Sequence, residues 1–208
     1  MKSIRRILRT LLALCLLYTA CTYARNTLGR YEPQEGDIVF QSLPHSPLTD
    51  AIEGASASPF SHCGILHRMG TQWVVIEAIG PVKETPFAEW VVQARDRKYT
   101  AFRLKVAYRT KIPAFIRAAQ TYEGRPYDTH YDFDDAAIYC SELVYKAFRK
   151  ATGEGLGRIQ KLGDLQWQPY AEVIKSIEGG KLPLDRRMIT PRSLSEAQQL
   201  EKIYTSGD

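Results

Sequence analysis

Residues 137–146 constrain the fold of this chain most, because they predict an amphipathic helix with a cysteine in its first turn. One apolar stripe recurs at helical spacing and is formed by Cys140, Val144, Ala147, Phe148 and Ala151. Asp134 and Asp135 stand before this helix as capping residues would, and Gly153 ends it. The stripe predicts that the helix packs into the core.

Cys140 is the residue of this helix that indicates chemistry. At a helix start, the unpaired backbone N–H groups and the positive end of the dipole favour an anion, which lowers the pKa of a thiol. A thiolate in that position is a nucleophile if a base lies beside it. The alternative is that Cys140 is a small core residue, since free cysteines are often buried.

The first 24 residues are predicted to be an export signal. A basic segment with Lys2, Arg5, Arg6 and Arg9 precedes an uncharged, mostly apolar run over residues 10–24. An N-terminal anchor is the competing interpretation, although the run is shorter than the roughly 20 residues that a membrane span needs. Cleavage before Cys21, as in a bacterial lipoprotein, and cleavage after Ala24 both stay open. We expect an exported protein of the bacterial envelope, either periplasmic or attached to the membrane through its N-terminus.

The basic charge of the chain is mostly a property of this leader. The chain has 28 Lys and Arg against 23 Asp and Glu, and its net charge of +5 falls to +1 without residues 1–20. We therefore expect no nucleic-acid partner. The leader region contains Cys15 and Cys21, which leaves Cys63 and Cys140 in the body of the chain. An oxidising compartment would allow these two to pair. The oligomeric state is left open.

The order of the expected elements indicates one α+β domain over residues 25–208. Strands are expected from their apolar residues at 36–40, 62–69, 72–79 and 99–105. One helical turn is expected in the loop 41–60, and helices are expected at residues 112–123 and 169–177. Ser193 and Glu196 form a capping box that predicts a last helix.

The hairpin over residues 62–79 supplies a candidate base for Cys140. With a two-residue turn at positions 69 and 70, His62 lies directly opposite Glu77. Their Cβ atoms would be about 4.5–5.5 Å apart on one face, so the carboxylate could orient the imidazole and stabilise its charged form. Cys63 would point to the other face, so we expect no disulfide with Cys140 unless a bulge intervenes.

An ordinary surface ion pair is the alternative for His62 and Glu77. Glu77 lies in the apolar run 73–79, where an unpaired carboxylate is costly, and this favours a buried pair. The other histidines, in loops or near the turn, are weaker candidates. A zinc site from His62, Cys63, Glu77 and Cys140 lacks the ligand spacing of zinc sites, so we predict neither a metal nor a cofactor.

Six short motifs stand in order along the chain, at residues 36–40 (GDIVF), 61–65 (SHCGI), 75–78 (VIEA), 80–83 (GPVK), 124–128 (GRPYD) and 139–144 (YCSELV). Together they resemble the YiiX family of permuted papain-like cysteine hydrolases, relatives of the NlpC-type cell-wall peptidases, over about residues 33–195. The resemblance implies a small antiparallel sheet packed against the nucleophile helix and further helices. It also implies Cys140 as nucleophile, His62 as base and Glu77 as orienting acid.

The resemblance implies amidase or peptidase activity. We expect a cysteine hydrolase that cleaves an amide bond in a small amide or peptide substrate, such as a cell-wall-derived peptide, through a thioester. Tyr139 and Tyr127 are expected to line the cleft, unless they serve as aromatic packing beside the helix. Two other functions stay open. One is an acyl-lipid hydrolase or acyltransferase, which a long apolar groove would favour. The other is a non-catalytic binding module of the envelope, which the intact Cys, His and Glu set argues against.

Overall fold

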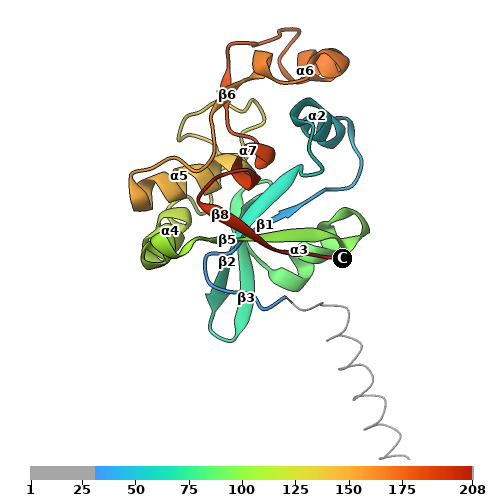
Figure 1. Ribbon diagram of the computed structural model, residues 1–208. Coiled ribbons are helices and arrows are strands. Elements are labelled where there is room, and N and C mark those ends of the chain that lie inside the picture. Colours follow the sequence, from blue (N-terminus) through green and yellow to red (C-terminus); the bar gives the residue numbers. More distant parts are fainter. Residues whose placement is uncertain (1–30, 208) are drawn as a thin grey trace, which may run out of the picture. The chain divides into compact units, whose positions relative to one another are not determined.

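The sheet at the centre of the fold is antiparallel throughout. A computed structural model describes residues 31–207, of which residues 33–207 belong to one compact unit. The export signal predicted for residues 1–24 lies outside the described residues. Within the described part, six strands pair in the order β4-β3-β2-β1-β5-β8 (Figure 1). They are β1 (Ile38–Gln41), β2 (His62–Met69), β3 (Gln72–Ala78), β4 (Val82–Pro86), β5 (Tyr99–Leu104) and β8 (Leu200–Thr205). The predicted α+β class is confirmed.

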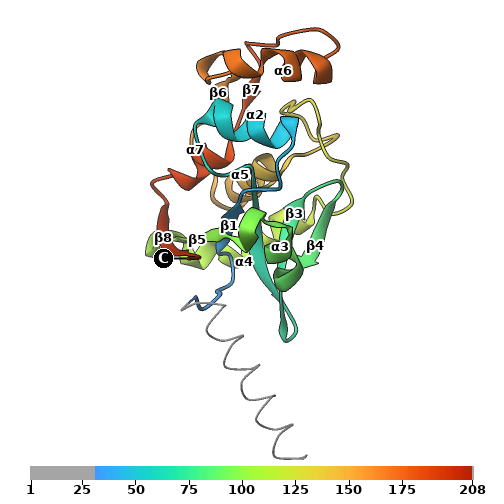
Figure 2. The same cartoon turned by 90° about the vertical axis from the view of Figure 1, so that its right-hand side faces the viewer.

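The helices surround this sheet. They are α2 (Pro47–Ser56), α3 (Phe87–Gln93), α4 (Ile112–Gln120), α5 (Cys140–Thr152), α6 (Ala171–Ile177) and α7 (Pro191–Ser195). The strands β6 (Gln160–Lys161) and β7 (Arg187–Met188) pair in a second, small sheet. Helix α2 lies between α6 and the large sheet in both views (Figures 1 and 2). Helix α5 ends at Gly153, whose φ of 82° is readily adopted by glycine, as the sequence predicts.

Different helices cover the two faces of the sheet. One face packs against α4 and α5 in a buried cluster that includes Ile38, Phe40, Ile65, Phe115, Leu143 and Phe148. Because side chains alternate along a strand, His62 and Glu77 lie on the opposite face. There Trp90 of α3 packs with its ring centroid 6.2 Å from that of His62. The catalytic candidates on β2 and β3 are therefore shielded from solvent by α3.

The motif at residues 36–40 fixes the start of β1. Gly36 has a φ of 77°, and a Cβ added there would lie 2.8 Å from Cγ2 of Ile112. Asp37 is buried and accepts hydrogen bonds of 2.7 and 2.8 Å from the guanidinium of Arg103 on β5. This motif therefore acts in the packing of the sheet.

The β2–β3 turn lies one residue later than the sequence predicted. Gly70, with a φ of 63°, and Thr71 form it, so Met69 pairs with Gln72. Gly64, and not His62, then lies directly opposite Glu77. The predicted register is wrong by two residues. A shift of two keeps every side chain on its face, so His62 and Glu77 still share one.

The sequence also misplaced the ends of two helices. Tyr139, and not Asp134 or Asp135, is the N-cap of α5. Thr190 caps α7 by accepting a 3.1 Å hydrogen bond from the backbone N–H of Ser193, so no helix begins at Ser193. The chain instead continues into β8, which completes the edge of the sheet beside β5. Strand β4 and helix α3 were also not predicted.

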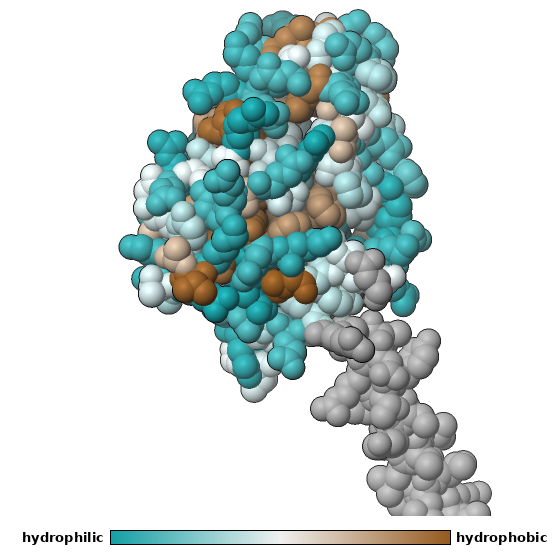
Figure 3. Space-filling model, viewed as in Figure 1, coloured by the Kyte–Doolittle hydropathy of each residue, from teal (hydrophilic) through white to brown (hydrophobic). Residues whose placement is uncertain are grey.

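Apolar side chains are scattered on the surface of the described residues. The large apolar side chains that are exposed there are Met69, Val92 and Val106, which belong to different elements. On the face in Figure 3, hydrophilic residues predominate and apolar residues form small separate patches. Within residues 31–207, no helix has the length and apolar character to cross a membrane.

Candidate active site

Cys140 begins α5 at the point where that helix meets the start of β2. Its sulfur lies 3.9 Å from the carbonyl oxygen of Ser61, the residue before β2. Only 4% of the cysteine is exposed. The N–H groups of the first turn have no partner within the helix, so they and the dipole favour negative charge at Cys140. The structure thus places Cys140 in the first helical turn, as the sequence predicted.

His62 and Glu77 form a buried hydrogen-bonded pair. The distance from Nε2 of His62 to Oε2 of Glu77 is 2.6 Å, and the side chains are 2% and 0% exposed. The other carboxylate oxygen accepts a 2.6 Å hydrogen bond from the hydroxyl of Thr85 on β4. With Nε2 engaged, Nδ1 is the nitrogen left for the hydrogen bond between His62 and Cys140. The sequence-predicted pair is therefore in contact, although its residues are diagonal and not opposite.

The electrostatics of the three residues favour an ion pair. Burial alone lowers the pKa of His62, but hydrogen bonds to Cys140 and Glu77 outweigh it and raise that pKa to about 9. The pKa of Cys140 is lowered well below its usual value by hydrogen bonds from Cys63 and His62, against the effect of burial. Burial raises the pKa of Glu77, and the hydrogen bond from His62 more than reverses this. Thiolate, imidazolium and carboxylate are thus the favoured states.

Cys63 lies beside Cys140 and not away from it. It points to the opposite face from His62, as alternation predicts, but that face packs against α5. The expectation that this orientation separates the two cysteines is therefore wrong. Both are buried free thiols. Alternation predicts the face of Cys63 but not its distance from Cys140, because α5 begins over the start of β2, where groups from both faces can reach the sulfur.

The two tyrosines singled out from the sequence occupy different places. Tyr127 lines a cavity beside Cys140, and burial raises the pKa of its phenol well above its usual value, so the hydroxyl stays protonated. It is held there because Ile138 hydrogen-bonds to both neighbours of Tyr127, Pro126 and Asp128. Tyr139 is buried behind the site, where its hydroxyl accepts a 3.0 Å hydrogen bond from the backbone N–H of Ile189.

The cavity beside Cys140 has mostly apolar walls. Its volume is about 100 Å³. Helix α2 contributes Leu48 and Ile52, α6 contributes Ile174 and Ile177, and Met188 and Ile189 close another side. This wall could not be predicted from the sequence, because α2 and α6 are far apart along the chain.

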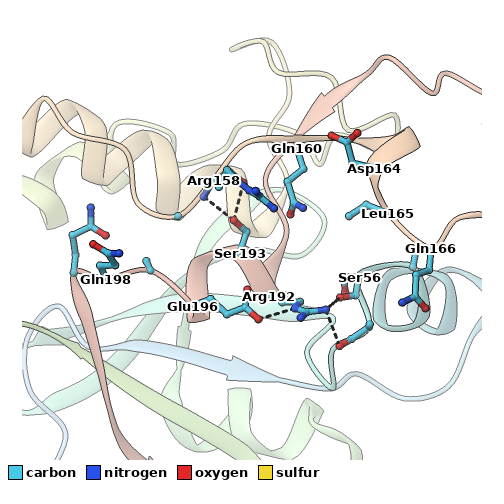
Figure 4. Close-up of a pocket in the computed structure, with 15 residues that line it drawn as sticks. Ser56, Arg158, Gln160, Asp164, Leu165, Gln166, Arg192, Ser193, Glu196 and Gln198 are labelled. Atoms are coloured by element: carbon cyan, nitrogen blue, oxygen red, sulfur yellow. Dashed lines mark hydrogen bonds and ion pairs between the residues drawn. The ribbon is translucent and has the colours of Figure 1, made fainter.

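A second, polar pocket of about 550 Å³ borders this cavity, and the two share Ala55 and Leu165. Figure 4 shows how its walls are tied together. Arg192 donates to the backbone oxygen of Ser56 and pairs with Glu196 at 2.7 Å. Ser193 exchanges two 2.7 Å hydrogen bonds with the backbone of Arg158. None of Cys140, His62 and Glu77 lines this pocket, whereas Cys140 lines the apolar cavity, so the chemistry of Cys140 belongs to the apolar cavity.

The other three histidines have acidic partners elsewhere. His45 pairs with Asp50 at 2.7 Å, and His67 pairs with Glu35 at 2.6 Å. His130 lies 3.5 Å from Glu178 at the rim of the apolar cavity. Thr85 and Trp90, which contact Glu77 and His62, were not foreseen. The segment 82–86 (VKETP) does not alternate between apolar and polar residues, so the sequence carried no strand signal that would place Thr85 beside Glu77.

Comparison with known proteins identifies the family. The family model of the permuted papain-like amidase enzymes, YaeF/YiiX, C92 family, matches residues 32–204. The chain belongs to this family. The match covers the sheet, α5 and the three residues Cys140, His62 and Glu77, so the fold expected from the sequence motifs is confirmed. Membership supports an enzyme of the amidase or peptidase class.

Two relatives agree with this assignment. The uncharacterized protein YiiX of Escherichia coli (strain K12) is 33% identical over 199 residues, which cover 93% of this chain and 94% of YiiX. The crystal structure of metalloprotein YiiX from Escherichia coli O157:H7 matches this chain with a TM-score of 0.78 and 32% sequence identity. The match covers 84% of this chain and 98% of the chain in that crystal structure.

Proposed function

We propose that this protein is a cysteine amidase in which Cys140 is the nucleophile, His62 the general base and acid, and Glu77 the residue that orients His62. One observation carries the proposal. The hydrogen-bonded series Cys140–His62–Glu77 is buried, and it lowers the pKa of the thiol while raising that of the imidazole to about 9. Perturbed pKa values in such a series are typical of nucleophilic catalysis.

The reaction follows from these protonation states. His62 holds the proton of Cys140, and the thiolate attacks the carbonyl carbon of the amide. His62 then gives that proton to the leaving amine as the carbon–nitrogen bond breaks, which leaves a thioester on Cys140. His62 next takes a proton from water, and the resulting hydroxide attacks the carbonyl carbon of the thioester. The carbon–sulfur bond then breaks, which releases the acid product and restores the thiolate of Cys140.

The negative oxygen of each tetrahedral intermediate needs hydrogen-bond donors. The backbone N–H of Cys140 is one, because it belongs to the first turn of α5. Tyr127 lines the same cavity as Cys140, and burial keeps its hydroxyl protonated, so it can donate a hydrogen bond. We assign the second donor to Tyr127. Tyr139 acts instead through Ile189, as a structural partner of the cavity wall.

A metal ion does not fit this site. The solved relative is called a metalloprotein, but residues 31–207 contain no group of three His, Cys, Asp or Glu side chains able to hold a metal. Nε2 of His62 and both oxygens of Glu77 already make hydrogen bonds within the site. No step of the proposed reaction uses a metal.

The walls of the cavity favour a second candidate function. Leu48, Ile52, Ile174 and Ile177 would surround the part of the substrate next to the thioester. A carboxylate-binding or ammonium-binding wall would suit a peptide, whereas these side chains suit an alkyl chain. We therefore propose, as the second candidate, hydrolysis or transfer of an acyl group joined to an amine. The leader predicted for residues 1–24 leads us to propose that the protein works in the cell envelope.

The test uses N-acyl amino acids of increasing chain length beside dipeptide amides. Amine release measures turnover, and the mass of the protein shortly after mixing reports a thioester. We expect an acyl adduct on the peptide that contains Cys140, no adduct in Cys140→Ala, and no turnover in His62→Ala. His67→Ala is the matched control, because His67 lies on the same strand and pairs with Glu35. Turnover that persists in Cys140→Ala would contradict the function, and preference for the peptides would exclude the second candidate.

A further inference from the structure

Cys63 is a buried thiol that the proposed reaction does not use, yet it lies next to the reacting sulfur. Ser61 and Cys63 are two residues apart in an extended segment, so their backbone groups point to the same edge of the strand. The sulfur of Cys140 lies 3.9 Å from the carbonyl oxygen of Ser61. Cys63 and Cys140 also belong to the same buried cluster, with exposures of 0% and 4%. The start of α5 therefore rests directly on this part of β2.

Two groups of Cys63 interact with the Cys140 sulfur. The thiol and the backbone of Cys63 both lower the pKa of Cys140, as hydrogen-bond donors to its sulfur do. The backbone N–H of Cys63 is available because the ladder between β2 and β3 ends at Gly64, opposite Glu77. Cys63 and His62 thus both stabilise the anionic form of the Cys140 sulfur.

The surroundings of Cys140 make these donors important. The titratable groups that interact with it are His62 and Cys63 from β2, Glu77 behind His62, and Tyr127, Tyr131 and Tyr139 before α5. Of these six, only His62 can carry a positive charge. His130 and Arg186 line the same cavity, but both pair with Glu178. A buried anion without hydrogen bonds is costly, and neutral donors reduce that cost without adding charge. Burial keeps Cys63 itself protonated, because it raises the pKa of that thiol well above the usual value.

We propose that Cys63 is a positioning residue, whose thiol and backbone N–H hold the sulfur of Cys140 as an anion beside His62. This inference rests on the proposed function, since it concerns the nucleophile of that reaction. The proposed role requires a hydrogen-bond donor in the side chain of residue 63, and a side chain of the same size without a donor should not replace it. A packing role would require only the size.

The test is the pH profile for alkylation of Cys140 by iodoacetamide, followed by mass mapping of the modified peptide. In Cys63→Ala and Cys63→Val, we expect the acidic limb of the profile to move to higher pH. Loss of one hydrogen-bond donor raises the pKa of a thiolate by about one unit, so alkylation on that limb should be slower by about tenfold. Cys63→Ser keeps a donor and should restore the wild-type limb. Ile65→Val is the matched control, because Ile65 is the next buried residue on the same face of β2. It should lower the melting temperature without moving the limb.

Each outcome decides the inference. Profiles of Cys63→Ala or Cys63→Val that overlay the wild type would overturn it. If neither apolar variant folds, Cys63→Ser decides, because a limb displaced to higher pH in that folded variant would show that the donor is not what matters. Failure of the proposed function gives a different result, since Cys140 in the wild-type protein would then react no faster than an ordinary thiol at any pH.

Discussion

Gly64 of β2 lies directly opposite Glu77 of β3, and His62 reaches the carboxylate of Glu77 from the diagonal position. Diagonal neighbours on one face are about 7–8 Å apart, which long or aromatic side chains can span. Gly64 places no side chain between the imidazole and the carboxylate. The pair therefore depends on a glycine at this point of the strand.

Substitution of Gly64 by alanine is expected to destabilise the fold. The new Cβ would lie 2.3 Å from Cγ1 of Val75 and 2.9 Å from the backbone oxygen of Ile76, which cannot move away without disturbing the ladder. We expect a loss of about 1–3 kcal/mol in the free energy of unfolding, measured by urea denaturation. Gly155→Ala is the control, because its Cβ would meet the movable hydroxyl of Tyr145 at 3.2 Å. Equal stability of the two variants would refute the packing argument.

Glu77→Gln tests whether the charge of Glu77 matters beyond its hydrogen bonds. The amide can still bond to His62 and Thr85, so we expect the fold to survive. Loss of the negative charge lowers the pKa of His62 and weakens the thiolate–imidazolium pair. We expect turnover to fall by about 10- to 1000-fold, less than the roughly 10⁴-fold loss for the equivalent change in a serine-protease triad. Unchanged turnover in the folded variant would make Glu77 a purely structural partner.

His62→Ala tests the source of the reactive thiolate. Without the imidazole, Cys140 loses one of the groups that lower its pKa, so its alkylation at neutral pH should slow by about tenfold or more. In the wild-type protein, Cys140 should react faster than Cys63, whose pKa is raised by burial. Mass mapping of the alkylated peptides measures both. Equal modification of the two cysteines in the wild type would rule out Cys140 as the special thiol.

The pairing of His62 with Glu77 could be predicted from the sequence, although the turn was misplaced. Any even shift of register keeps both residues on one face, so the conclusion did not depend on the exact turn. The position of Cys140 in the first turn of α5 could also be predicted, because the apolar stripe and Gly153 define that helix. Both features are local, and local patterns are what a sequence shows directly.

The contacts that the sequence did not predict are made between distant segments. Thr85 reaches Glu77 from β4, and Ile52 and Ile174 meet in the cavity wall although 122 positions separate their numbers. The strand β8 was missed because Ser193 and Glu196 have the pattern of a capping box for a last helix, whereas the helix there is the short α7, which Thr190 caps. The position of Cys63 was misjudged for a similar reason. The alternation of side chains along β2 predicts the face of the sheet on which Cys63 lies, but it does not predict which helix covers that face.

The pH dependence of turnover is expected to show an alkaline limb set by His62. The pKa of His62 is raised to about 9 by its hydrogen bonds to Cys140 and Glu77, which outweigh burial. Below this value the imidazolium can protonate the leaving amine, and above it that proton is lost, so kcat/KM should fall as the pH rises through about 9. The acidic limb should lie well below the usual pKa of a thiol, because that of Cys140 is lowered.

The variant Glu77→Gln assigns this alkaline limb. Removal of the carboxylate charge takes away one of the interactions that raise the pKa of His62, so the limb should move to lower pH while the fold persists. Profiles of kcat/KM for the two proteins, measured between pH 5 and 10 with one substrate, make the comparison. His67→Ala should leave the limb in place, because His67 pairs with Glu35 outside the site. An alkaline limb that stays in place in Glu77→Gln would show that a group other than His62 sets it.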